Sequence, residues 1–137
     1  MRRALALAAV MTVAVAGVAQ AESWKKYVDA DNGISWSYDA DYAYKDRASG
    51  RVVVMQAISK PSANLGPSGP GKADGVGSVV AIDCAKKDMI VMGSYKPSQP
   101  LAISPTWRSD APKKAAGSDN EALVGAVCAA SGSFPTK

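Results

Sequence analysis

The chain has 137 residues, with 16 Lys and Arg, 12 Asp and Glu, two Cys and no His. The absence of His excludes nucleophilic pairs in which an imidazole activates Ser or Cys, and it excludes His as a metal ligand. The length suits a single domain with one hydrophobic core.

The first 21 residues have the pattern of a secretory signal. Residues 1–3 are Met-Arg-Arg, residues 4–18 carry no charge and are mostly apolar, and residues 19–21 are Ala-Gln-Ala, which suits signal peptidase. The apolar run is too short for a membrane span. We therefore expect a signal peptide at 1–21 and one domain at 22–137. Loss of two arginines would lower the net charge from +4 to +2, which, together with export, argues against a nucleic-acid partner.

Cys84 and Cys128 are the only cysteines. Export would bring them into an oxidising compartment, where they can form one intramolecular disulfide. The chain-entropy model gives such a cross-link about 4 kcal/mol for a loop of about 45 residues. A redox or metal-binding pair is disfavoured because the chain has no Cys-x-x-Cys motif and no further soft ligand.

The position after the expected cleavage point is Glu22, where a bacterial lipoprotein would carry its lipid-bearing cysteine. No second apolar stretch of membrane length follows. We therefore expect an exported protein without an integral membrane segment, located in the periplasm, secreted, or at the cell surface.

Strand patterns fill the first part of the exported domain. Tyr27–Asp29 and Ile34–Tyr38 flank an Asp-Asn-Gly sequence, which predicts a tight hairpin turn. Alternation in the second segment predicts one buried face, with Trp36 and Tyr38 in the core, and one wet face. Asp39–Gly50 is polar and rich in turn residues. Arg51–Ser59 contains a β-branched run that predicts a more deeply buried strand.

The middle of the chain predicts a long loop and a second hairpin. Pro61–Gly77 is rich in Gly and Pro, which favours a loop within one domain. Ser78–Cys84 and Met89–Tyr95 predict paired strands, and alternation places Cys84 on the same face as Val80 and Ile82. Lys96–Gly117 contains four prolines and predicts an irregular crossing segment held to the domain by its apolar residues, which are Leu101, Ile103 and Trp107.

A helix is expected at the end of the chain. Residues 118–121 have the Ser-x-x-Glu pattern of a capping box. An apolar stripe at helical spacing follows, made by Leu123, Ala126, Val127 and Ala130. Cys128 lies beside this stripe, so a disulfide to Cys84 would attach the helix to a strand. Strands followed by one helix predict an α+β domain with an antiparallel sheet.

Several of these segments resemble the surface-adhesin protein E-like family. The resemblance is carried by Ala81–Cys84, the strand ending at Tyr95, Trp107, the Ser118-x-x-Glu121-x-Leu123 pattern and Val127–Cys128, with Trp24, Tyr38–Asp39 and Val52–Met55 in the expected order. It implies a concave antiparallel sheet of about six strands, with a C-terminal helix tethered by one disulfide. It also implies adhesin-like binding of proteins.

Two groups of residues are candidate binding sites. Tyr42 and Tyr44 lie in the polar stretch, where aromatic side chains can act as interface anchors. Lys86 and Lys87, with the basic pairs at 25–26 and 113–114, could contact anionic groups, although such short blocks are also typical of solvated turns. We expect no metal site: four acidic residues (Asp29, Asp31, Asp39 and Asp41) suggest a calcium loop, but Ile34 and Ala40 occupy the positions where that loop needs Gly and Glu. We expect no cofactor either.

No set of residues meets the requirements for catalysis. We therefore expect a non-enzymatic envelope protein that recognises a protein partner, either host matrix or another envelope protein, through its sheet surface. An alternative is a periplasmic inhibitor or chaperone-like binder that inserts the 61–77 loop into its partner. A further alternative is a small-molecule binder with a cleft between helix and sheet.

Overall fold

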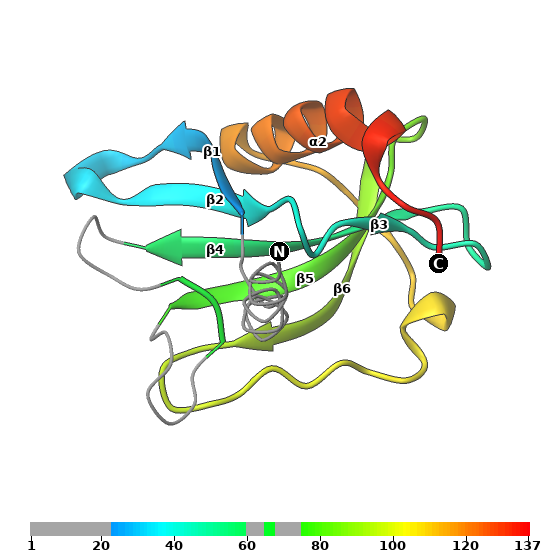
Figure 1. Ribbon diagram of the computed structural model, residues 1–137, viewed down its shortest axis with the longest axis horizontal. Helices are drawn as coiled ribbons and strands as arrows, with labels where there is room; N and C mark the ends of the chain where they lie inside the picture. Colours follow the sequence, from blue (N-terminus) through cyan, green and yellow to red (C-terminus); the bar gives the residue numbers. More distant parts are fainter. Residues whose placement is uncertain (1–22, 60–64, 68–74) are drawn as a thin grey trace, which may run out of the picture.

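The computed structural model describes residues 23–59, 65–67 and 75–137. The expected signal peptide and most of the 61–77 loop lie outside this part of the chain. The described residues form one antiparallel sheet and one long helix (Figure 1). The strands are β1 (Trp24–Asp29), β2 (Ser35–Asp39), β3 (Tyr44–Lys45), β4 (Val52–Ser59), β5 (Val76–Asp83), β6 (Asp88–Tyr95) and β7 (Lys113–Lys114). The helix is α2 (Ser118–Ala130), and short 3-10 turns occur at η1 (Asp31–Gly33), η2 (Trp107–Ser109) and η3 (Ser131–Ser133).

The strand order is β1-β2-β4-β5-β6-β7, and β3 also pairs with β4. β2 pairs with the second half of β4, through Tyr38 and Gln56, while β3 pairs with its first half, through Tyr44 and Val53. The end of the chain then lies beside β3, where the Lys45 amide donates to the Pro135 carbonyl at 2.7 Å. The predicted α+β class is confirmed, and the short β3 and β7 are strands that the polar sequence around them did not indicate.

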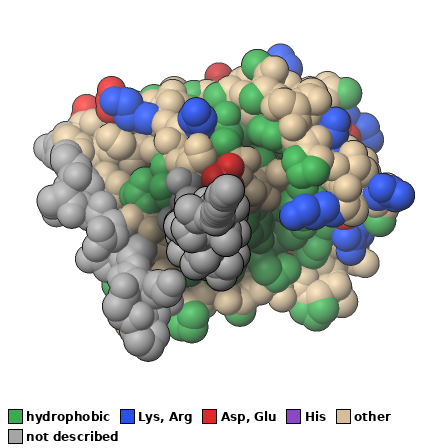
Figure 2. Space-filling model, viewed as in Figure 1, with side chains coloured by type: hydrophobic (Ala, Val, Ile, Leu, Met, Phe, Trp, Pro, Cys, Tyr) green, Lys and Arg blue, Asp and Glu red, His purple; other side chains and the backbone are tan. Residues whose placement is uncertain are grey.

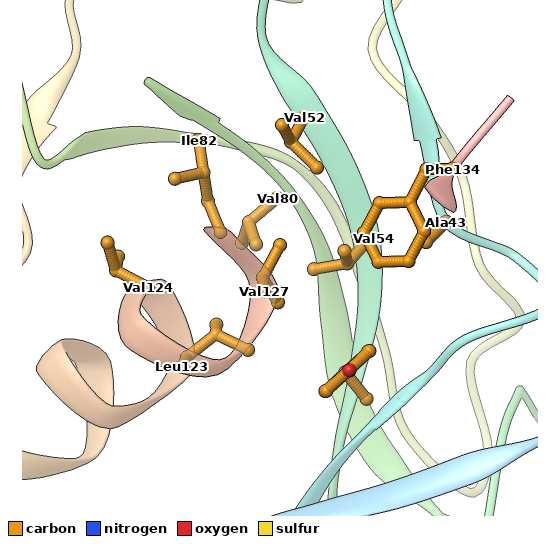
Figure 3. Close-up of a cluster of buried hydrophobic side chains, with 10 residues drawn as sticks. Ala43, Val52, Val54, Val80, Ile82, Leu123, Val124, Val127 and Phe134 are labelled. Atoms are coloured by element: carbon orange, nitrogen blue, oxygen red, sulfur yellow. The ribbon is translucent and has the colours of Figure 1, made fainter. Parts of the chain in front are cut away.

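The helix packs on one face of the sheet, which we call the helix-side face. Leu123, Val124 and Val127 of α2 are buried there, and Figure 3 shows them facing the strands. Phe134 closes the cluster next to Val54. The strand residues of this core alternate with those of the opposite face and are Tyr38, Val52, Val54, Val80 and Ile82.

The predicted disulfide is confirmed. Cys84 and Cys128 are joined with a Cα–Cα distance of 5.8 Å, and both pack against the helix-side cluster. The bond therefore ties the last turns of α2 to the end of β5.

The opposite face has its own core, closed by the crossing segment. Trp107 is only 4% exposed and lies with Val53, Met55, Val79, Ala81, Ile90, Met92 and Tyr95. The segment approaches β6 so closely that a Cβ on Gly93 would lie 2.2 Å from the Ala102 carbonyl oxygen. Leu101 is partly buried here as expected, but Ile103 is 38% exposed, so the prediction that it anchors the segment is wrong.

Two predictions for the first pair of strands are wrong. The β1–β2 connection is a longer loop containing η1, and the Ala30 amide donates to the Ile34 carbonyl at 2.8 Å. The wet face expected for β2 is buried, since Ser37 and Asp39 are 7% and 4% exposed. The Asp39 carboxylate tolerates burial because it accepts the amides of Ser23 and Asp41.

The capping box is also wrong. Ser118 is the first helical residue, and the cap is Gly117, at φ +91° with no side-chain hydrogen bond. The Glu121 amide donates instead to the Gly117 carbonyl at 3.0 Å. One strand end differs as well, because β5 begins at Val76, inside the predicted loop. Trp36, expected in the core, is only half-buried.

Candidate functional site

Half of the helix-side face is not covered by α2. Beyond the first turn of the helix, the outward side chains of β4, β5 and β6 line two neighbouring cavities that share Gln56 and Ser78. The first, of about 460 Å³, includes Val80 and Val91 and extends to the segment before α2. The second, of about 400 Å³, includes Ile58 and Val76. We call these cavities together the sheet groove.

Exposed apolar side chains lie in this groove. Among the described residues, the large hydrophobic side chains that are exposed are Val76 at 43%, Val91 at 56% and Ile103 at 38%. The two valines both line the groove. An apolar surface with a polar rim is typical of a site that contacts another molecule.

A polar network forms the boundary between the covered and uncovered halves of the face. Gln56, only 6% exposed, donates from Nε2 to the Tyr27 hydroxyl at 2.8 Å and accepts from the Ser78 hydroxyl at 3.1 Å. Burial raises the pKa of the Tyr27 phenol above its ordinary value. Both polar ends of the Gln56 amide are therefore held, and the groove floor is pre-organised.

The rim of the groove carries charge near the start of α2. The lining of the first cavity includes Lys113, Lys114, Asp110 and Asn120. The Lys114 ammonium donates to the Lys86 carbonyl at 2.8 Å, which holds β7 against the β5–β6 turn. The groove thus offers exposed apolar side chains, a fixed amide and a cationic edge.

Tyr42 and Tyr44 lie elsewhere. Their rings are tilted, with centroids 6.4 Å apart, and they pack as half-buried side chains against the core of the opposite face. Burial raises the pKa of both phenols, and for Tyr44 the neighbouring Asp46 adds to the effect. The Lys137 ammonium lies 5.2 Å from the Tyr44 ring centroid. This pair does not contribute to the sheet groove.

Lys86 and Lys87 are exposed in the β5–β6 turn, where Lys87 has a φ of +56°. The pair at 113–114 lies beside them, because β7 pairs with the start of β6 and the Ala115 amide donates to the Lys87 carbonyl at 3.0 Å. Two of the three basic pairs therefore converge, whereas the pair at 25–26 is on β1. The two predicted groups, tyrosines and lysines, are on separate elements.

Among residues 23–59, 65–67 and 75–137, no group of three His, Cys, Asp or Glu side chains could hold a metal ion. Two acidic residues of the rejected calcium loop serve local roles: Asp29 pairs with Lys26 at 3.1 Å, and Asp39 accepts backbone amides. In the same described ranges, no helix is long and apolar enough to cross a membrane.

Apart from the basic pair at 113–114, the groove residues were not singled out by sequence. Val76 falls in the segment that reads as a loop, and Gln56 interrupts a β-branched strand without a recognisable motif. The one available signal is that Gln56 breaks the run of apolar residues at 52–55, which marks the row where the face changes from apolar to polar.

Comparisons of the chain with known protein families, with curated proteins and with solved structures found no match.

Proposed function

We propose that this chain is a non-enzymatic, exported protein of the cell envelope that binds a protein partner in the sheet groove. One observation carries the proposal: Val76 and Val91 are exposed in the two adjoining cavities of the groove, and the Gln56 amide that both cavities share is already held in place. A partner that covers these valines gains their burial without having to order the floor, and pre-organised sites bind more tightly for that reason.

Export is supported by the pattern at residues 1–21 and by the Cys84–Cys128 disulfide, because such bonds persist in oxidising compartments. The tethered helix on an antiparallel sheet is also the arrangement that the resemblance to the surface-adhesin protein E-like family implies. That resemblance favours an adhesin-like partner such as host matrix. A periplasmic envelope protein is the alternative.

Location separates the two forms. In cells of the source organism that express the full chain, surface protease treatment should release the protein if it acts as an adhesin. Recovery only by osmotic shock would contradict the adhesin form and leave the periplasmic one. The proposal of export itself would fail if the protein were found in the cytoplasm with both cysteines reduced.

The groove is tested by photo-crosslinking. A photoreactive amino acid in place of Val91 should give a defined adduct with one partner, and the same group in place of Ile103 should not. Ile103 is a matched control because it is apolar and exposed but lies outside the groove. Equal adducts from both positions, or none from position 91 in extracts that contain the partner compartment, would contradict the proposal.

A second candidate, small-molecule binding, is favoured by the size of the first cavity. Its volume of about 460 Å³ falls within the range of ligand pockets, about 300–1,000 Å³. Native mass spectrometry of protein purified from its own compartment distinguishes the two. A stoichiometric small ligand that is lost in the Gln56→Leu variant would support the second candidate over the first.

A further inference from the structure

The end of the sheet opposite the second cavity of the groove is strongly basic. One row of paired residues crosses five strands and consists of Lys45 on β3, Val52 on β4, Ile82 on β5, Met89 on β6 and Lys113 on β7. Four inter-strand spacings of about 4.8 Å make this row about 19 Å wide. Both ends of the row are lysines, and the turns beyond it carry more.

Seven cationic side chains gather at this end, from the β3–β4 connection, the β5–β6 turn, β7 and the chain end. We call them the basic end, and they are Lys45, Arg47, Lys86, Lys87, Lys113, Lys114 and Lys137. The Arg47 amide donates to the Lys137 carbonyl at 2.8 Å, which places these two beside Lys45. Figure 2 shows Lys and Arg side chains along the corresponding, right-hand end of the molecule.

Three carboxylates in this region are already occupied, whereas Asp110 and Glu121 line cavities that also include Lys113 and Lys114 or Lys87. Asp46 binds Arg108, Asp88 binds Arg51 at 2.8 Å, and Asp83 accepts the turn amides of Ala85 and Lys86 at 3.0 Å. Within the described residues, none of the seven basic side chains forms an ion pair with a carboxylate. Their positive charge is therefore presented outward, although the exported chain as a whole would be only slightly basic.

The shape of the basic end favours a broad, flat counter-surface. Its cations are spread over turns, two short strands and the chain end, and only Lys113 and Lys114 also line the sheet groove, so a single small anion would contact few of them. The exposed large hydrophobic side chains of the described residues, Val76, Val91 and Ile103, are not part of it. Contact would therefore be electrostatic, at the level of headgroups and without insertion of apolar side chains.

We propose that the basic end docks the protein on an anionic phospholipid bilayer. The second cavity of the sheet groove lies about six residues further along β4 and β5, between Ile58 and Val76, which is about 20 Å from the basic row. A membrane-bound molecule would thus keep that part of the groove open to a partner. The proposal does not depend on the function assigned to the groove.

The test uses the oxidised, exported protein and sedimentation with vesicles of phosphatidylcholine alone or mixed with phosphatidylglycerol. We expect binding only to the mixed vesicles at low salt, with a steep loss at high salt because the Debye length shrinks. The double variant Lys86→Glu/Lys87→Glu should bind at least about 25-fold more weakly, since each basic residue near such a surface contributes about fivefold.

The matched control is Lys25→Glu/Lys26→Glu. It changes the net charge equally, but Lys26 lies in the row of Ser37 and Ala57, about 16 Å along the strands from the basic row. Melting curves verify that both variants fold. Equal weakening in the two variants would overturn the proposal, because net charge alone would then explain binding. Binding to soluble polyglutamate without binding to vesicles would also overturn it and indicate an acidic protein partner instead.

Discussion

The two faces of the sheet are closed by different clamps. On the helix-side face, α2 is held by the Cys84–Cys128 disulfide. On the opposite face, the crossing segment is held by Trp107 and by an ion pair in which Arg108 binds Asp46 through two hydrogen bonds of 2.9 and 2.5 Å. A covalent clamp responds to the redox state and an ionic clamp responds to pH, so the two faces should loosen under different conditions.

Removal of the covalent clamp should have the largest effect. We expect the double variant Cys84→Ser/Cys128→Ser to lower the free energy of unfolding by about 4 kcal/mol, because the unfolded chain regains the entropy of a loop of about 45 residues. Chemical denaturation of the variant and of the oxidised and reduced wild type measures it. The same midpoint for oxidised and reduced protein would show that the disulfide does not stabilise the helix-side face.

The apolar contact beneath that clamp comes next. Leu123 is fully buried between α2 and the sheet, so Leu123→Ala should cost about 3 kcal/mol through lost burial and the cavity left behind. Val76→Ala on the uncovered half of the same face should cost less than about 0.5 kcal/mol. Similar losses in the two variants would mean that the covered and uncovered halves do not differ as described.

The ionic clamp should fail in acid. The Arg108 guanidinium, with help from Ser49, lowers the pKa of Asp46 from 3.8 to about 2. A carboxyl group whose pKa is lower in the folded state than in the unfolded state stabilises the fold fully when the pH is above its unfolded-state pKa. That contribution is lost as the pH falls through the folded-state pKa. About 2 kcal/mol should therefore disappear between about pH 4 and pH 2.

The variant Asp46→Asn isolates this contribution. It should be less stable than the wild type at neutral pH, and the difference should vanish as the pH falls through about 2. Denaturation at several pH values follows both proteins, with and without reductant. A difference between them that does not change with pH would show that hydrogen bonding of Asp46, rather than its charge, holds the crossing segment.

The helix-side clamp could be predicted from sequence because each part has a local signature. Two cysteines allow one pairing, and alternation along β5 placed Cys84 on the face of Val80 and Ile82. The α-helix followed from its apolar stripe, although the cap did not, since Gly117 adopts a positive φ and takes the place that the Ser-x-x-Glu pattern suggested for Ser118.

The ionic clamp and the groove could not be predicted. Asp46 and Arg108 are 62 residues apart, and one Asp among several in a polar stretch carries no sign of its partner. The groove depends on where the helix begins relative to the strands, which is a tertiary property. The convergence of Lys86 with Lys114 likewise needed the pairing of β7 with β6, a strand too short to show a pattern.

The smallest effect concerns the network that separates the covered half of the helix-side face from its groove. Tyr27→Phe removes the hydroxyl that accepts from the buried Gln56 amide, so it should cost about 1 kcal/mol. Tyr42→Phe is a matched control, since that ring is half-buried on the opposite face and no hydrogen bond of its hydroxyl is evident among the described residues. The control should change stability by less than about 0.3 kcal/mol.

If both variants lose the same amount of stability, the network does not hold the groove floor. If only Tyr27→Phe is destabilised and the adduct formed through position 91 also weakens, the amide of Gln56 links the packing of the helix-side face to recognition in its groove.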